Sequence, residues 1–146
     1  MYFEDFTAGY SFLTESHTVS KDEIVNFATQ WDPQPFHIDE IKANDYPYGG
    51  LIASGWHTLL ISFRLVLETG IFEKASIGSP GMQELRWLLP VKPGDKLLTK
   101  AIVQSAKRSK SNPARGFINV NYAVINQREE NVATYAITHM LRVGPK

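Results

Sequence analysis

The sequence has 146 residues, 43% of them hydrophobic, so it can bury an apolar core without the help of disulfides or metal ions. We expect a single domain over residues 1–146. It contains no cysteine, which excludes disulfides, thiol catalysis and thiolate metal sites. The 15 basic and 15 acidic residues balance, and the basic ones form no dense arm, so no nucleic-acid partner is expected.

The charges are unevenly spread along the chain. Residues 1–48 carry nine acidic and two basic side chains, whereas residues 86–146 carry eleven basic and three acidic ones. This cationic half suits either a small polyphosphate ligand or the solvent-facing sides of strands, and both interpretations stay open. The acidic, aromatic opening MYFEDFTAGY is unlike a secretory leader, and the uncharged stretch Gly49–Phe63 is too short to span a membrane. We therefore expect a cytoplasmic protein with no membrane partner.

The first predicted elements are a strand and a capped helix. Residues Ser11–Val19 are β-prone, follow the turn residue Gly9 and predict a strand. Ser20 and Glu23 form a capping-box pair ahead of apolar residues, which predicts a helix over Lys21–Trp31. The helix must end there, because a proline-rich segment follows.

That segment, Asp32-Pro33-Gln34-Pro35, is stiff, because each proline fixes its own φ and disfavours helical geometry in the residue before it. His37 therefore lies on a rigid connection. Beyond it we expect a short helical turn over Ile38–Asn44 and an irregular loop over Asp45–Gly50.

The longest apolar segment is Ser54–Thr69, with apolar side chains on nearly all sides and Gly70 placed to end it, which predicts an enclosed helix. Period-two alternation then predicts four antiparallel strands, at Gly81–Leu89, Lys96–Lys107, Gly116–Asn126 and Asn131–Val143. A meander of such strands buries the helix by curling around it, so the predicted fold class is α+β. A single sheet leaves one edge and part of the helix poorly covered, which favours a dimer.

Asp32 and His37 are the first candidates for chemistry. A carboxylate and an imidazole that meet at one water molecule can divide the work of hydration, one positioning the water and the other moving its proton. The structural alternative is an aspartate that ends a helix and a histidine bonded to backbone. No pair of histidines has a metal-ligand spacing and no glycine-rich phosphate loop is present, so neither a metal nor a nucleotide cofactor is implied.

Three ordered motifs carry a resemblance that covers nearly the whole chain. The segments are FATQWDPQPFHID at Phe27–Asp39, GLIASGWH at Gly50–His57 and QELRWLLPVKPGD at Gln83–Asp95. Together they resemble the signature of MaoC-like dehydratases and R-specific enoyl-CoA hydratases. The resemblance implies a hot-dog fold, an antiparallel sheet wrapped around a long central helix, and catalysis by Asp32 and His37.

Gly55 is the expected oxyanion donor, because hydration of an enoyl thioester places negative charge on the carbonyl oxygen. If Ser54 is the N-cap, the Gly55 amide lies in the first helical turn, where N–H groups lack intrahelical acceptors and the helix dipole favours an anion. The resemblance assigns the same role to this position. The alternative is a glycine needed for helix entry or close packing.

Other residues are expected to shape the binding of substrate. The candidates near the thioester and acyl chain are Trp31, Gln34, Phe36, Ser54 and Trp56. Gln34 and Phe36 depart from the family pattern, which has an asparagine and an aliphatic residue there, so they bear on substrate identity. The basic residues Lys107, Arg108, Lys110 and Arg115 are candidates for phosphate binding, and an exposed hairpin tip is the alternative.

The resemblance therefore implies a cytoplasmic hydro-lyase of fatty acid metabolism that interconverts 2-enoyl-CoA and (R)-3-hydroxyacyl-CoA, or similar thioesters. Its substrate would carry coenzyme A or an acyl carrier pantetheine, with no further cofactor. The expected assembly is a homodimer or a higher oligomer of dimers. The alternatives are a hot-dog acyl-CoA thioesterase and a non-catalytic acyl-CoA-binding subunit.

Overall fold

The computed structural model of the protein describes residues 1–145. Its helices are α1 (Lys21–Trp31), α2 (Pro35–Ile38) and α3 (Gly55–Glu68), with short 3-10 turns at Phe3–Asp5 and Lys42–Asp45. Its strands are β1 (Ser11–Leu13), β2 (His17–Thr18), β3 (Gly81–Trp87), β4 (Lys96–Arg108), β5 (Arg115–Ile125) and β6 (Asn131–Arg142). Among these residues, no helix combines the length and apolarity needed to cross a bilayer.

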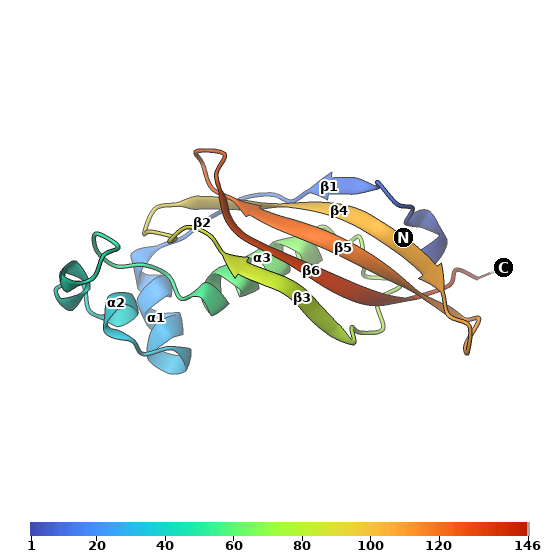
Figure 1. Cartoon of the computed structure of the whole chain (residues 1–146), viewed down its shortest axis with the longest axis horizontal. Coiled ribbons are helices and arrows are strands. Elements are labelled where there is room, and N and C mark those ends of the chain that lie inside the picture. The colour runs from blue at the N-terminus through green and yellow to red at the C-terminus, as the bar shows by residue number, and fades with distance from the viewer. Residues whose placement is uncertain (146) are drawn as a thin grey trace.

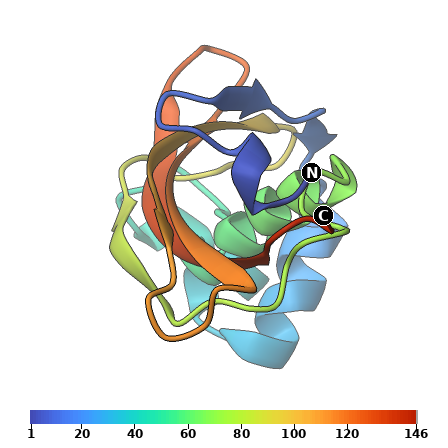
Figure 2. The same ribbon diagram turned by 90° about the vertical axis from the view of Figure 1, so that its right-hand side faces the viewer.

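The strands form one antiparallel sheet in the order β1–β4–β5–β6–β3, with β2 also paired to β4. Figure 2 shows the sheet curling around α3. Ser62 of α3 is bonded to the sheet at 2.7 Å from both Thr99 of β4 and Tyr135 of β6. This buried hydroxyl network fixes the rotation of the helix against the sheet. The α+β class and the hot-dog fold are confirmed.

The predicted strand Ser11–Val19 is divided into β1 and β2. Both parts pair with β4. Between them the Thr14 hydroxyl accepts the amide of Thr99 at 2.9 Å, so a side chain replaces a backbone partner and the regular ladder stops.

The order of the strands differs from a simple meander. Only β4, β5 and β6 follow one another in space, whereas β3 pairs with β6 rather than with β4. The connection Val91–Asp95 therefore carries the chain from one edge of the sheet to the far side of β5. This path leaves the outer edge of β3 without a partner strand in residues 1–145.

Helix α1 is tied to α3 through its own cap. Glu23 completes the expected capping box by accepting the Ser20 amide at 3.2 Å. The same carboxylate lies 2.8 Å from His17 Nε2 of β2 and 3.4 Å from His57 Nε2 of α3. Burial alone would raise the pKa of Glu23, but the hydrogen bonds from His17 and Ser20 lower it, so the carboxylate stays charged. α1 and α2 together cover one end of α3 (Figure 1).

Helix α3 is not enclosed within one chain. Its sheet-facing residues are buried, but Trp56, Leu60 and Leu67 lie on an exposed face, with Leu60 52% exposed. The prediction of an enclosed helix is wrong for a single chain, because the sheet covers only one side of α3. The apolar residues on the other side of the helix indicate that a second surface covers it.

Strand β3 contains a bulge. Gln83 pairs with Ala136 and Arg86 pairs with Thr134, so two residues of β3 oppose one residue of β6. Glu84, one of the two, has a φ of 54°, in the left-handed region that side chains other than glycine adopt at a cost. The bulge changes which face the later residues of β3 present.

His139 of β6 gives the fold a specific sensitivity to acid. Its Nε2 lies 2.7 Å from the Tyr122 hydroxyl, and burial lowers the pKa of His139 from 6.5 to about 4. The folded state holds this imidazole neutral. The contribution of His139 to the free energy of unfolding is therefore fully present above pH 6.5 and is lost as the pH falls toward about 4. At about 1.4 kcal/mol per pKa unit, the loss is about 3 kcal/mol.

We therefore expect His139→Gln to flatten the pH dependence of the free energy of unfolding between pH 6.5 and 4, as measured by urea denaturation. Tyr122→Phe is the matched control, since it removes the hydrogen bond and keeps the titrating group. An unchanged slope in His139→Gln would contradict the assignment.

Candidate active site

A cavity of about 420 Å³ lies where α1, α2 and the start of α3 meet the segment that follows β3. Its walls are formed by Asp32, Gln34, His37, Tyr48, Ile52, Ala53, Gly55, Trp56, Thr58, Trp87, Leu88, Leu89, Pro90 and Val91. Two backbone bonds assemble these walls: Ile52 N–H donates to Phe36 O at 3.0 Å, and Ala53 N–H donates to Val91 O at 2.8 Å. The cavity thus joins segments from all three predicted motifs.

Asp32 is the C-cap of α1, with its own amide bonded to Ala28 O at 2.8 Å. Its Oδ1 accepts a hydrogen bond from Gln34 Nε2 at 2.7 Å, and its Oδ2 accepts one from Ser54 Oγ at 2.7 Å. Burial acts to raise the pKa of Asp32, but these two donors and the nearby His37 lower it below its ordinary value. The carboxylate is therefore held as an anion.

His37 is buried on α2, with 4% of its surface exposed. Its Nδ1 lies 2.7 Å from the carbonyl oxygen of Ile52. A carbonyl only accepts, so Nδ1 carries the proton that it donates, and Nε2 is left to face Asp32. The edge of Phe36 packs against the imidazole at 4.4 Å between ring centroids, which holds the ring in this orientation.

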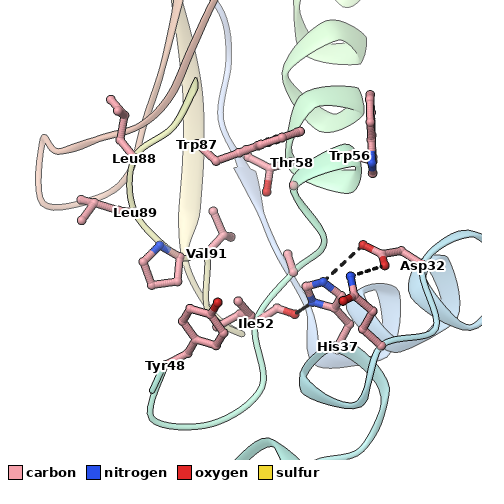
Figure 3. Close-up of a pocket in the computed structure, with 14 residues that line it drawn as sticks. Asp32, His37, Tyr48, Ile52, Trp56, Thr58, Trp87, Leu88, Leu89 and Val91 are labelled. Atoms are coloured by element: carbon pink, nitrogen blue, oxygen red, sulfur yellow. Dashed lines mark hydrogen bonds and ion pairs between the residues drawn. The ribbon is translucent and has the colours of Figure 1, made fainter. Parts of the chain in front are cut away.

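The two candidate side chains converge. His37 Nε2 lies 3.3 Å from Asp32 Oδ2, and both residues line the same cavity (Figure 3). A water molecule beside this pair can contact both a fixed anion and an imidazole nitrogen whose tautomer is set by the backbone. The geometry suits proton transfer at Nε2, next to a charge that stabilises the imidazolium.

Gly55 begins α3 and lines the cavity. The first intrahelical bond here is from Thr58 N–H to Ser54 O, and the Gly55 amide has no acceptor among residues 1–145. Trp87 covers the α-carbon of Gly55 so closely that an added β-carbon would lie 2.4 Å from the indole. The close-packing explanation for this glycine is therefore also supported, and the two roles are compatible.

Ser54 has a different role from the one predicted. It occupies the N-cap position of α3, but its side chain makes no capping hydrogen bond. Its hydroxyl donates to Asp32 instead, and the residue is fully buried. Ser54 thus positions the carboxylate, as does Gln34, whereas Trp56 forms part of the cavity wall.

Two predicted substrate-binding residues do not line this cavity. Trp31, at the end of α1, is 69% exposed and lies with Trp56 over a separate shallow surface. Phe36 lies behind His37 and packs on Tyr46 and Tyr48 rather than facing the cavity. Neighbouring residues of a helix end point in different directions, so closeness to Asp32 in sequence did not place either ring in the pocket.

The basic hairpin between β4 and β5 is remote from the cavity of the same chain. It lies at the end of the sheet that carries the termini, opposite α1 and α2 (Figure 1). Arg108 is engaged by Glu4 at 2.7 Å and by Pro113 O at 2.9 Å. The structure therefore does not bring Lys107, Arg108, Lys110 or Arg115 to the site of the same chain. The first three are exposed, as the hairpin-tip alternative has it, whereas Arg115 is half-buried over the ring of Phe117.

Several cavity residues were missed by sequence reasoning. The most important is Ile52, whose contribution is a backbone carbonyl that any residue type could supply. Trp87, Leu88 and Leu89 lie within the third motif, which was read only as a strand and a turn. The consecutive run Trp87-Leu88-Leu89, which breaks the period-two alternation, was the available signal. Within residues 1–145, no group of three or more acidic or histidine side chains is arranged to hold a metal ion.

This site occurs on a chain that is similar to known proteins. A family model described as MaoC like domain matches residues 5–127. The protein YdeM of Bacillus subtilis (strain 168), described as uncharacterized, is 39% identical over 132 residues, which are 90% of this chain and 92% of YdeM.

Solved structures show the same likeness. The MaoC-like dehydratase from Rhodospirillum rubrum superposes with a TM-score of 0.92 at 34% identity, covering 100% of this chain and 99% of that one. The R-hydratase PhaJ1 from Pseudomonas aeruginosa superposes with a TM-score of 0.74 at 19% identity, covering 98% and 86% of the two chains. The second similarity is one of fold alone.

The hydroxyl of Ser54 provides a direct test of how the site controls its carboxylate. We expect Ser54→Ala to raise the pKa of Asp32, because the anion loses a donated hydrogen bond while its burial is unchanged. Titration of the labelled Asp32 carboxyl carbon by NMR measures this shift. Ser105→Ala, a half-buried serine of β4 outside the cavity, is the matched control. An unmoved Asp32 titration in Ser54→Ala would contradict the assignment.

Proposed function

This chain belongs to the MaoC-like domain family, and from that premise we propose that it is a hydro-lyase that adds water to an acyl thioester and removes it. The observation that carries the proposal is the 3.3 Å approach of Asp32 Oδ2 and His37 Nε2 at one cavity, beside the Gly55 amide, which has no acceptor among the residues that the structure describes. The substrate class is a 2-enoyl thioester, with (R)-3-hydroxyacyl thioester as the hydrated form, attached to coenzyme A or to a carrier pantetheine.

His37 is the proposed acid–base residue. Its Nδ1 proton is committed to Ile52, so Nε2 is the atom that exchanges a proton with water. Asp32 is disfavoured as the base, because its donors hold its pKa low. Its role is to orient the water and to stabilise the imidazolium that forms 3.3 Å away.

In the proposed reaction, His37 is the residue that carries the proton between water and substrate. In hydration, His37 Nε2 removes a proton from water while the water oxygen forms a bond to C3 of the enoyl group. The electrons move to the thioester carbonyl oxygen, which accepts a hydrogen bond from the Gly55 amide. The proton on Nε2 is then delivered to C2, which regenerates the imidazole. Dehydration follows the same steps in reverse.

The same fold features support a homodimer. The outer edge of β3 has no partner strand in residues 1–145, and the apolar side chains of Trp56, Leu60 and Leu67 are exposed on the neighbouring face of α3. A second copy that adds its own β3 to this edge would extend the sheet and cover the helix.

We expect His37→Gln to lower the hydration rate of a 2-enoyl-CoA about 100-fold to 10,000-fold, the usual range for loss of a proton-transfer group. Asp32→Asn is also expected to lower the rate strongly, because the water loses the anion that orients it and the imidazolium loses its stabilising charge. The measurement is the fall in ultraviolet absorbance as the conjugated double bond is hydrated. Circular dichroism would show whether the fold is kept, and Asp39→Asn, a neighbouring aspartate outside the cavity, is the matched control.

Product analysis separates this proposal from its rivals. A 3-hydroxyacyl thioester supports the hydro-lyase, whereas free thiol identifies a thioesterase. Thioester binding without turnover identifies a binding subunit. Near-normal hydration by Asp32→Asn or His37→Gln would remove the proposed mechanism.

For the dimer, we expect Leu60→Glu to shift the protein toward monomer in sedimentation velocity, because a charge would be buried at the covered face of α3. Lys110→Glu, on the remote hairpin, is the control and should leave the oligomeric state unchanged. A wild-type protein that is monomeric at all concentrations would contradict the proposal.

A further inference from the structure

The indole ring of Trp87 lies against Gly55 at the start of α3. A β-carbon on residue 55 would be 2.4 Å from Trp87 Cε2 and 2.5 Å from its Nε1, so a larger residue does not fit beneath the ring. The ring also meets Trp56 edge-on, with centroids 5.6 Å apart. Figure 3 shows Trp87 reaching from the end of β3 to the first turn of α3. It forms a wall of the active-site cavity beside the Gly55 amide.

The bulge in β3 is what turns Trp87 inward. Tyr135 of β6 faces α3, since its hydroxyl bonds to Ser62 of that helix. Residues on β6 that are two apart share this face, and Trp87 is paired with one of them, Ala133. Met82 is paired with another, Ile137. Met82 and Trp87 are five residues apart, so in a regular strand they would point to opposite faces.

A second cavity, which we call the side cavity, lies further along the same helix and strand. It has a volume of about 370 Å³, no formally charged side chain lines it, and its apolar lining includes Leu59, Leu60, Phe63, Met82 and Ile137. On α3 its wall begins at Leu59, the residue after Thr58 of the active-site cavity. Both cavities are therefore lined by α3 and β3, the active-site cavity at the end of β3 that carries Trp87 and the side cavity at the end that carries Met82.

Resting on the proposed function, we propose that Trp87 determines specificity by closing the active-site cavity toward the side cavity, which restricts the substrate to short acyl chains. A thioester whose carbonyl oxygen meets the Gly55 amide must direct its acyl chain past the indole that covers Gly55. With the ring in place, the chain has only the active-site cavity to occupy. Without it, the side cavity offers an apolar extension of comparable volume.

The size of the effect follows from burial of the chain. Each methylene that moves from water into an apolar cavity strengthens binding about fourfold. Several methylenes in the side cavity would therefore favour a long chain over a short one by more than about 100-fold. The wild type, with the side cavity closed, is expected to gain nothing from added methylenes.

The test measures binding of the saturated thioesters butanoyl-CoA, octanoyl-CoA and dodecanoyl-CoA by calorimetry, because these ligands lack the double bond and cannot be hydrated. The wild type is expected to bind butanoyl-CoA at least as tightly as dodecanoyl-CoA. Trp87→Ala is expected to bind dodecanoyl-CoA at least about tenfold more tightly than the wild type does. Trp31→Ala, an exposed tryptophan outside the cavity, is the matched control.

A second variant tests the seating of the ring without removing it. Gly55→Ala keeps the backbone amide, but its β-carbon cannot coexist with the indole where it lies. We expect it to shift the preference toward longer chains in the wild-type background and to add nothing in the Trp87→Ala background. This non-additivity distinguishes a displaced wall from general loosening of the fold.

The outcomes separate the inference from the proposed function. Wild-type affinity that rises steadily with chain length, or a Trp87→Ala protein with the wild-type order, overturns the role of Trp87. If the thioesters bind in the expected order of affinity but no enoyl thioester is hydrated, the proposed hydro-lyase activity is overturned and the role of Trp87 in chain-length selection stands. Failure of all three thioesters to bind overturns both.

Discussion

The hydrogen bond between His37 Nδ1 and the carbonyl of Ile52 is the interaction on which the site depends. It decides which imidazole nitrogen carries a proton, and so which nitrogen faces Asp32. It also joins α2 to the segment that leads into α3, so the histidine and the start of that helix are placed by one contact. Asp32, held by Ser54 and Gln34, completes the arrangement from the opposite side. An imidazole nitrogen, an anion and the Gly55 amide are thereby fixed around one cavity.

The curled sheet supplies the rigidity that this arrangement needs. Ser62 connects α3 to two strands, so the helix neither slides nor rotates against the sheet without breaking buried hydrogen bonds. Glu23 connects the same helix to α1, whose last turn presents Asp32. The site residues lie on loops and helix ends, but each loop is anchored to an element that the core holds. Function and stability therefore depend on the same central helix.

Local patterns predicted the elements well, because they are properties of neighbouring residues. The capping box placed the start of α1, and Asp32 before proline placed its end. Long-range pairing was less accessible: nothing in the alternation of residues 81–89 specifies β6 rather than β4 as the partner. The Ile52 carbonyl was not predictable from side-chain chemistry, because every residue has one. The sequence wrongly suggested that Trp31 and Phe36 line the cavity. Both are close to a candidate residue in sequence, but sequence closeness does not determine where a side chain at the end of a helix points.

The backbone hydrogen bonds of Ile52 and Ala53 limit which substitutions the site tolerates. Three contacts that assemble the site use main-chain atoms of Ile52, Ala53, Phe36 and Val91. Mutations that exchange these side chains leave the ties in place, so homologues can drift at such positions and inherit the same geometry. Proline is the exception at residues 52 and 53, since it lacks the N–H that each tie requires. Proline at either position is therefore expected to disrupt the site, whatever other substitutions the packing there allows.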